Sequence, residues 1–378
     1  MIQNIVKLQL RDKKDHYAVT FYKEIRNRLG ITSKSILLLK IREQILIRIP
    51  NVDFAVTIPK KIIVDSTSLI EIEVIKIYNQ EECLKRDNLD IDGEDVQLNA
   101  LIPTKTVYGK NIFVLDFKGK QYVWYSVGGG VKPILINKNV NLIELAELIG
   151  FFFGDGSTSQ SIRSFRLTNA EPSTLIHCLN ILERIGISRN LFKAQIIYSS
   201  NTEINQQIKE KCIDYWIRIL NLNRNQIISV SRSKAKTRSL EYGSARIFFD
   251  NSTFLEIMLH GVLKKFIEIL LSASNSSERN ILIGFMRGLA AAEGYVGLTK
   301  LNSLSKLSLS FDPHSTELYF YRILLKNLGV EPAKVRGNQL YIYRISNFKI
   351  FNEINLFKFH DTKKEKFKLG YKNHRYSP

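Results

Sequence analysis

Apolar residues recur in short runs through the first 130 residues, and these runs favour strands over helices. Two runs, at 36–41 and 45–49, flank Arg42-Glu43-Gln44 and predict a hairpin. A short helix is predicted at 23–29, where Gly30 would end it. Further strands are predicted at 54–58, 69–77, 111–117 and 121–127. The first part of the chain is therefore predicted to be a β-rich domain.

The clearest break in this pattern is Gly128-Gly129-Gly130, followed by Pro133, because glycine and proline both interrupt regular structure. We place a domain boundary there, so that the β-rich domain covers residues 1–130. Helical and strand patterns then alternate, and they do so twice. The first repeat is assigned to 131–270, with an insertion at about 188–241, and the second to 271–378.

Each repeat runs in the order helix, strands, amphipathic helix, strands, helix. The first contains "LIGFFFGDG" at 148–156, "STLIHCLNILERIGI" at 173–187 and "GSARIFFDNSTFLEI" at 243–257. The second contains "MRGLAAAEG" at 286–294, "TELYFYRILLKNLGV" at 316–330 and "GNQLYIYRISNFKIFNEI" at 337–354. A duplicated unit predicts a pseudo-two-fold architecture.

The opening helices of the two repeats carry small residues four positions apart. Residues at this spacing share one helix face, and small side chains on that face let two backbones approach closely. We therefore predict that the two helices pack against each other. The predicted interface residues are Gly150, Gly154, Gly284, Gly288 and Ala292.

Each of these helices ends in an acid, Asp155 or Glu293, and a glycine follows each acid. Two carboxylates held close together at helix C-termini repel each other and feel the negative end of the helix dipole. A divalent cation with oxygen ligands removes that conflict, and Mg²⁺ commonly takes one or two protein carboxylates. We predict a Mg²⁺ (or Mn²⁺) site formed by Asp155, Glu293, Gly154 and Ala292.

The formal net charge is +19, from 55 Lys and Arg against 36 Asp and Glu. Such an excess predicts a polyanionic partner or an anionic membrane, unless it only covers a solvated surface. No apolar run reaches the ~18 residues of a membrane span, and no signal peptide is visible. The three cysteines form no CxxC and are interpreted as buried thiols in a reducing compartment. The six histidines show no metal-ligand spacing, which argues against zinc.

Basic residues gather within the repeats. Between positions 334 and 376 there are eleven Lys and Arg against three Asp and Glu. Basic side chains among tyrosines suit sheets that face DNA, where phosphate contacts position the protein and base edges specify the sequence. The residues predicted to bind DNA are Arg163, Arg232, Lys234, Lys236, Arg238, Arg246, Lys264, Lys265, Arg336, Arg344 and Lys364.

The two motifs that end in Asp155-Gly156 and Glu293-Gly294 resemble the paired signatures of the LAGLIDADG homing endonuclease family, single-chain type. The resemblance implies an α+β fold of two αββαββα repeats with pseudo-two-fold symmetry, here preceded by a β-rich domain. It implies that each acid serves the cut on one DNA strand. It also implies a lysine near the acids. The alignment favours Lys363 for this position, and a lysine that contacts phosphate or is merely solvated is the open alternative. Glu293 departs from the usual aspartate and leaves the metal geometry open.

The segment 17–50 resembles a swapped-hairpin (AbrB-like) DNA-binding element, in which a short helix ending in "RLGI" precedes a strand pair. An ordinary β-domain that packs on its neighbour fits the same thirty residues, so the role of this segment stays open.

These observations favour a site-specific DNA endonuclease of intron homing, with Asp155, Glu293 and Lys363 as catalytic residues. The alternative is a LAGLIDADG-derived DNA- or RNA-binding protein, such as an intron maturase or a regulator, that does not cleave. A structural protein with acidic partners is a third possibility. The expected partner is double-stranded DNA, bound by a monomer in the reducing, nucleoid-containing cytoplasm and away from any membrane.

Overall fold

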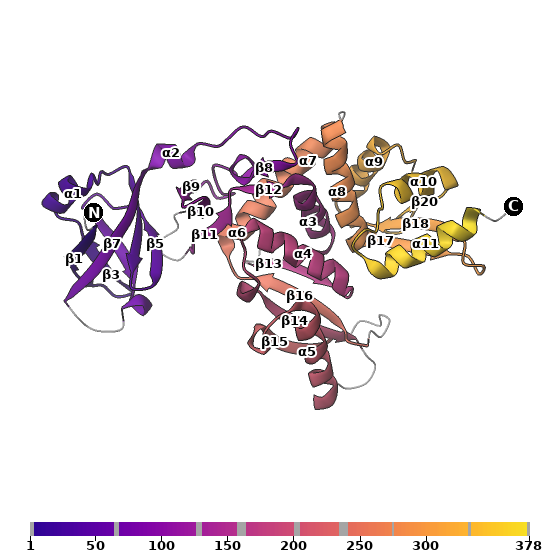
Figure 1. The fold of residues 1–378 in the computed structure, drawn as a ribbon, viewed down its shortest axis with the longest axis horizontal. Helices are drawn as coiled ribbons and strands as arrows, with labels where there is room; N and C mark the ends of the chain where they lie inside the picture. The colour runs from indigo at the N-terminus through magenta and orange to yellow at the C-terminus, as the bar shows by residue number, and fades with distance from the viewer. Residues whose placement is uncertain are drawn as a thin grey trace. The chain divides into compact units, whose positions relative to one another are not determined.

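The computed structural model describes residues 4–63, 68–125, 131–156, 164–199, 205–233, 241–273, 276–331 and 334–375. The chain divides into two compact units, each described here by itself (Figure 1). The first unit comprises residues 1–87 and 102–138, and the second comprises 88–101 and 139–378. Helices and sheets together confirm the predicted α+β class. The predicted domain boundaries at 130 and 270 stay a prediction.

Antiparallel strands build the first unit. One sheet has the order β1-β7-β4-β5, from β1 (Ile5–Gln9), β7 (Leu69–Asn79), β4 (Ser35–Ile41) and β5 (Gln44–Arg48). Another has the order β2-β3-β6, from β2 (Arg11–Asp12), β3 (His16–Thr20) and β6 (Ala55–Pro59). The order β11-β10-β9 joins β11 (Ile134–Asn137), β10 (Lys120–Tyr125) and β9 (Ile112–Phe117). The helices are α1 (Lys23–Leu29), η1 (Lys60–Ile62) and α2 (Gln80–Leu84).

Strand β4 is buried on both faces, which explains its nearly continuous apolar sequence, SILLLKI. Leu37 and Leu39 belong to one core cluster of this unit, whereas Ile36 and Leu38 belong to another. The predicted hairpin is confirmed as β4 and β5, and the predicted helix as α1. The predicted strand at 121–127 is β10 as far as Tyr125, and its last two residues lie outside the described residues.

The second unit opens with a strand pair, β8 (Asp95–Gln97) and β12 (Asn139–Asn141), and the short helix η2 (Leu98–Leu101). The first half continues with α3 (Leu142–Asp155), β13 (Phe165–Asn169), α4 (Pro172–Ile185), η3 (Arg189–Leu191), β14 (Lys193–Ser199), α5 (Gln206–Leu220), η4 (Arg224–Gln226), β15 (Ile227–Ser233), β16 (Ser244–Phe249), α6 (Ser252–Glu256), a π-helix (Ile257–Val262) and α7 (Leu263–Ser272). The second half contains α8 (Ser276–Glu293), β17 (Gly294–Leu298), β18 (Leu304–Ser310), α9 (Glu317–Asn327), β19 (Lys334–Arg336), β20 (Gln339–Ile342), α10 (Ile345–Glu353) and α11 (Asp361–Arg375).

The sheets of the two halves have similar strand arrangements. Their strand orders are β13-β16-β14-β15 and β17-β18-β20-β19. The glycine after each acid pairs with the neighbouring strand in the same way, Gly156 with Leu167 and Gly294 with Leu309. The first sheet differs because β14 and β15 run parallel, with α5 between them in sequence. The segment from β14 to β15 thus forms a β-α-β unit, visible in Figure 1 where α5 lies beside β14 and β15.

Helices α3 and α8 pack closely along glycine faces. A side-chain carbon added at Gly150 would lie 2.0 Å from the carbonyl oxygen of Phe285. One added at Gly288 would lie 2.0 Å from the carbonyl oxygen of Glu147. One added at Gly284 would lie 2.8 Å from the carbonyl oxygen of Ile143, so small residues permit this approach of two backbones. Within the described residues, none of the helices has the length and apolar character needed to cross a membrane.

Candidate nucleic-acid interface

Asp155 and Glu293 lie in the last turns of α3 and α8 and come close together where these helices meet. A side-chain carbon at Gly154 would lie 2.6 Å from Cβ of Ala292 and 3.1 Å from Cγ of Glu293. The amide nitrogen Nδ2 of Asn169, at the end of β13, donates to Oδ2 of Asp155 over 2.6 Å. The helix pairing therefore places both predicted acids at the edges of the two sheets.

The surroundings of the two acids disfavour their charged forms. Burial raises the pKa of Asp155 to about 6, although the hydrogen bond from Asn169 and the charge of Lys363 oppose this shift. Burial, followed by the negative charges of Asp155 and Glu317, raises the pKa of Glu293 to about 7. Near neutral pH this pair therefore holds less negative charge than two ordinary carboxylates.

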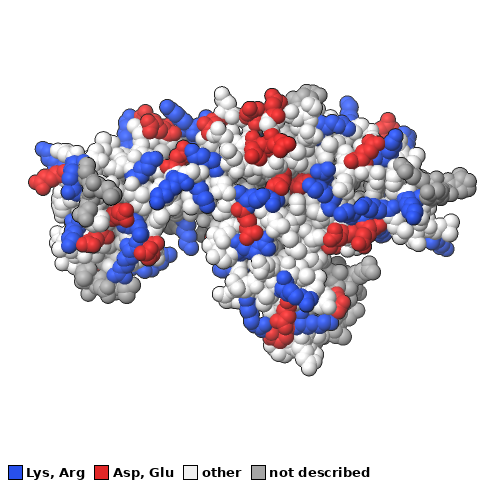
Figure 2. All heavy atoms as spheres, viewed as in Figure 1, with Lys and Arg blue, Asp and Glu red and all other residues white. Residues whose placement is uncertain are grey.

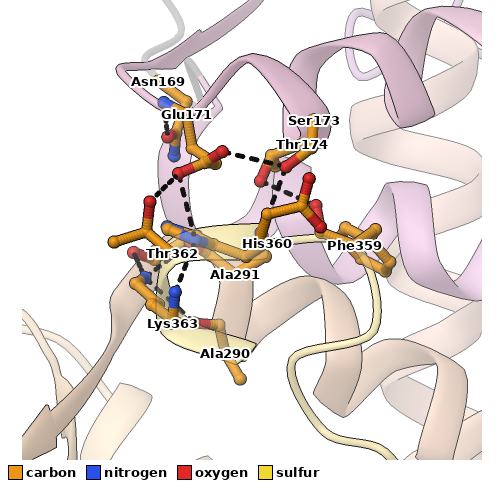
Figure 3. A network of polar contacts seen from close by, with 12 residues as sticks. Asn169, Glu171, Ser173, Thr174, Ala290, Ala291, Phe359, His360, Thr362 and Lys363 are labelled. Atoms are coloured by element: carbon orange, nitrogen blue, oxygen red, sulfur yellow. Dashed lines mark hydrogen bonds and ion pairs between the residues drawn. The ribbon is translucent and has the colours of Figure 1, made fainter. Parts of the chain in front are cut away.

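Lys363, on α11, closes the C-terminal end of α8. Its Nζ donates to the carbonyl oxygens of Ala290, Ala291 and Ala292 over 3.1, 2.7 and 3.2 Å (Figure 3). The last carbonyls of a helix lack partners within the helix, and an ammonium group at this end also meets the negative end of the dipole. Burial lowers the pKa of Lys363 to about 8, while the charges of Asp155 and Glu293 oppose that shift.

The start of α11 is bonded to the start of α4 (Figure 3). Thr362 donates through Oγ1 to Oε2 of Glu171 over 2.6 Å, and the backbone N–H of Asp361 donates to Oγ of Ser173. Oγ1 of Thr174 donates to the carbonyl oxygen of Phe359 over 3.1 Å. These contacts join the two halves of the second unit beside the acids, so they fix the helix that carries Lys363.

The predicted metal ligands form a small donor set. Among the described residues there is no group of three or more His, Cys, Asp and Glu side chains suited to a metal. The carbonyl oxygen of Ala292 already accepts a hydrogen bond from Lys363. Asp155 and Glu293 remain as two carboxylates, a number that Mg²⁺ accepts when water completes its shell. The Mg²⁺ or Mn²⁺ site stays a prediction.

Glu147 forms a buried charged cluster in the middle of α3. Its carboxylate is fully buried and contacts His177 of α4 at 2.8 Å, and Arg287 of α8 and Lys358 at 3.2 Å each. Burial alone would raise the pKa of Glu147, but the hydrogen bond and charge of His177 and the charge of Lys358 outweigh it and lower the pKa. The sequence analysis missed this cluster, although an acid between the apolar residues Ala146 and Leu148 of this helix signals it.

The solvent side of the second sheet carries polar, aromatic and basic side chains. In β18, Lys306, Ser308 and Ser310 alternate with the buried Leu307 and Leu309. Across the sheet, Gln339 of β20 accepts from Ser308 and donates to Ser310, over 2.7 Å each. The ammonium of Lys306 lies 4.6 Å from the ring centre of Tyr341. These side chains adjoin the end of α8, where Glu293 lies.

The solvent side of the first sheet is built around arginines. Arg246 of β16 donates to Thr168 of β13 over 3.3 Å and to Gln195 of β14 over 3.5 Å. Arg166 of β13 donates to Ser164 over 2.8 Å. Neighbouring core-side positions such as Leu167 are buried, so polar and apolar side chains separate onto the two faces of the sheet.

The predicted DNA-binding residues are spread over several elements. Arg246 lies on the first sheet face, whereas Arg232 and Arg336 are exposed on the edge strands β15 and β19. On α7, Lys264 is exposed and Lys265 pairs with Glu268. Arg344 pairs with Glu331 at 2.6 Å and Lys364 is half-buried on α11. The structure therefore does not bring these residues into one cluster. Outside the described residues lie Arg163, Lys234, Lys236 and Arg238.

Several side chains on these faces were not predicted. Arg166, Lys306 and Tyr295 were missed, and so was Lys366, whose ammonium lies 4.9 Å from the ring centre of Tyr295. The alternation in LSKLSLS was a signal for Lys306. Figure 2 shows basic side chains gathered over α11, which carries Lys364, Lys366, Lys368 and Lys372.

No protein-family model matches the chain, and no curated protein matches it. Solved structures do match. "Crystal structure of full-length DUF199/WhiA from Thermatoga maritima" has 14% identity and a TM-score of 0.34, with 61% of this chain and 61% of that chain covered. "Crystal structure of the N-terminal LAGLIDADG domain of DUF199/WhiA" has 13% identity and a TM-score of 0.32, with 57% and 82% covered. The chain thus spans about six tenths of the full-length protein.

The comparisons correct the expected function. The titles of both structures name DUF199/WhiA, one of them names a LAGLIDADG domain, and neither names an endonuclease. The homing endonuclease assignment, and with it the assignment as an enzyme, is therefore wrong. The LAGLIDADG resemblance is kept for the fold alone. The physical reason for the error is that helices ending in acids define a scaffold, whereas chemistry depends on the groups around them.

Proposed function

We propose that this protein is a LAGLIDADG-derived DNA-binding protein that does not cleave. In this proposal the second unit consists of two repeats of the αββαββα type, related by a pseudo-two-fold axis at the α3–α8 pair. Both repeats lie in one chain, so a monomer suffices. Double-stranded DNA lies along the polar faces of the two sheets.

One observation carries the proposal: both sheets keep apolar side chains on one face and basic, hydroxyl and amide side chains on the other. Arg246 with Gln195 on the first sheet, and Lys306 with Gln339 on the second, are the side-chain types that contact phosphates and base edges. The net charge of +19 adds a general attraction to a polyanion.

The acids have a structural role in this proposal. Asp155 accepts a hydrogen bond from Asn169, and Lys363 places its positive charge near both acids while it caps α8. The motif is retained because these contacts hold the helix ends together. Cleavage is not needed to explain the acids.

The test is DNA binding by the full chain, measured by fluorescence anisotropy with labelled duplexes over a range of salt concentrations. Affinity should fall linearly in log salt, and Arg246→Ala or Lys306→Ala should lessen the slope by about 0.9 for each lost phosphate contact. Lys326→Ala, an exposed lysine on α9, is the matched control. The same duplexes incubated with Mg²⁺ should stay intact. Absence of binding at low salt, or the appearance of cut products, would contradict the proposal.

A further inference from the structure

A hollow lies on the solvent side of the second sheet, beside the end of α8. Its volume is about 450 Å³, within the range of about 300–1,000 Å³ typical of small-ligand pockets. Side chains from β17, β18 and β20 line it, among them Tyr295, Ser308 and Tyr341, and Glu293 at the end of α8 lines it as well. It is therefore large enough for one small aromatic ligand.

Two tyrosines and one serine form a row across this hollow. The strand register pairs Tyr295 with Ser308, and Ser308 with Tyr341. Directly paired residues share a face, and neighbouring strands lie about 4.8 Å apart, so the two tyrosines stand roughly 10 Å apart. The small, buried Ser308 lies between them. The row thus has the form of a slot with a low floor between two tyrosines, and the ring of Tyr341 stacks on that of Tyr343, with ring centres 6.1 Å apart.

Charges and hydrogen-bonding groups accompany the walls. The ammonium of Lys306 lies 4.6 Å from the ring centre of Tyr341, and that of Lys366 lies 4.9 Å from the ring centre of Tyr295. At the floor, the amide of Gln339 bonds to two serine hydroxyls and keeps one N–H and one lone pair for a further partner. Aromatic rings, cations and an amide together match a planar base that carries a phosphate.

We propose that this slot binds one unpaired nucleotide of a DNA strand. Its base stacks on the ring of Tyr295, and its phosphate meets Lys306 and Lys366. The inference rests on the proposed DNA binding and specifies what the second repeat holds. A free mononucleotide carries the same chemistry, so the experiment separates the two sources.

The first repeat lacks the floor of such a slot. When Leu167 is aligned with Leu309 through their paired glycines, Arg166 takes the place of Ser308 and Phe248 that of Tyr341. A long arginine side chain fills the space that a serine leaves open. The two faces should therefore differ in their response to an unpaired base.

The experiment compares two labelled duplexes, identical except that one contains a single bulged 2-aminopurine nucleotide. The full chain should bind the bulged duplex about tenfold more tightly, as expected for one stacked base, and should quench its 2-aminopurine fluorescence. Tyr295→Ala, at a half-exposed position, should remove the preference and the quenching without loss of paired-duplex binding. Ser308→Arg should do the same by filling the floor. Tyr319→Ala, a highly exposed tyrosine on α9, is the control and should change neither readout.

The other outcomes overturn the inference. Equal affinity for both duplexes contradicts the proposed nucleotide slot but leaves the proposed DNA binding intact. Failure to bind either duplex removes the proposed function and the inference with it. Adenosine monophosphate is the second probe: if it saturates the wild type but not Tyr295→Ala, and the bulge gives no preference, the slot belongs to a free nucleotide instead.

Discussion

The two central helices differ in character at the position eight residues before each acid. In α3 this position is Glu147, which sits in a charged cluster with His177, Arg287 and Lys358. In α8 the same position is Phe285, whose ring centre lies 5.9 Å from that of Phe153 and 5.9 Å from that of Phe320.

This difference shows that a shared frame does not make the two halves interchangeable. A helix pair built from two copies of α3 would bury two acids, and one built from two copies of α8 would leave Arg287 without its buried carboxylate. Uncompensated buried charges are costly, so the charged cluster specifies which helix pairs with which.

The largest expected effect tests the close packing of α3 against α8. Gly150→Leu and Gly288→Leu should each lower the free energy of unfolding by about 3 kcal/mol or more, because both positions lie against backbone atoms that cannot give way. Gly93→Ala is the control, since the nearest atom to its added carbon lies at an ordinary 3.4 Å. Urea denaturation measures all three. If only one of the two leucine variants is destabilised, the two helices do not contribute equally to the interface.

The next effect tests the charged cluster. Glu147→Leu should destabilise the protein by about 3 kcal/mol, because Arg287 and Lys358 would lose their buried counter-charge and His177 its hydrogen-bond partner. Phe285→Leu, at the matching position of α8, should cost less, about 1 kcal/mol, because it keeps an apolar residue of similar size. Thermal melts that rank these variants in the opposite order would show that the aromatic cluster, and not the charged one, holds the pair.

A smaller effect concerns pH. The pKa values of Asp155 and Glu293 are raised to about 6 and about 7, so these groups stabilise the fold below pH ~4, and this contribution is lost as pH rises through 6 and 7. We expect the free energy of unfolding to fall over this window as the two carboxyl groups lose their protons. The double variant Asp155→Asn, Glu293→Gln should flatten the profile, measured by urea unfolding between pH 4 and 7.5. An unchanged profile would assign the pH dependence to other groups.

The wild type and this double variant also test the predicted metal site. If two carboxylates hold Mg²⁺, added Mg²⁺ at pH 7.5 should raise the midpoint of wild-type unfolding, since binding to the native state alone stabilises it. The double variant should show no such rise. Identical curves with and without Mg²⁺ in the wild type would argue against the predicted site.

The smallest effect tests the cap on α8. Lys363→Met should lower stability by about 1 kcal/mol, because three carbonyl groups of α8 lose their donor. Lys364→Met, one position further on α11, is the matched control and should have little effect. Amide hydrogen exchange then locates the change: it should quicken in the last turn of α8 in the first variant only.

The regular structure of the protein could be predicted from the sequence more fully than the candidate site could. Strand β4 could be predicted because a strand buried on both faces has a nearly continuous apolar sequence, with residues such as Leu37 and Leu39. The paired acids predicted the two central helices. The resemblance expected Lys363 near the acids, but the bonds of Lys363 to the carbonyls of α8 and the partners of Glu147 could not be predicted. Both depend on residues far away in sequence that only the folded chain brings near. The endonuclease assignment failed for the same reason, since the motif does not report the surroundings of its acids.

The cap on α8 has a consequence for the order in which the protein is made. Lys363 follows Ala290 by 73 positions, so α8 is synthesised well before its lysine. At about 5–20 residues per second, this interval is on the order of ten seconds. During that time α3 and α8 can pair through their glycines, but the last carbonyls of α8 lack the ammonium group that caps them. The C-terminal helix therefore completes the junction only when translation of this part of the chain ends.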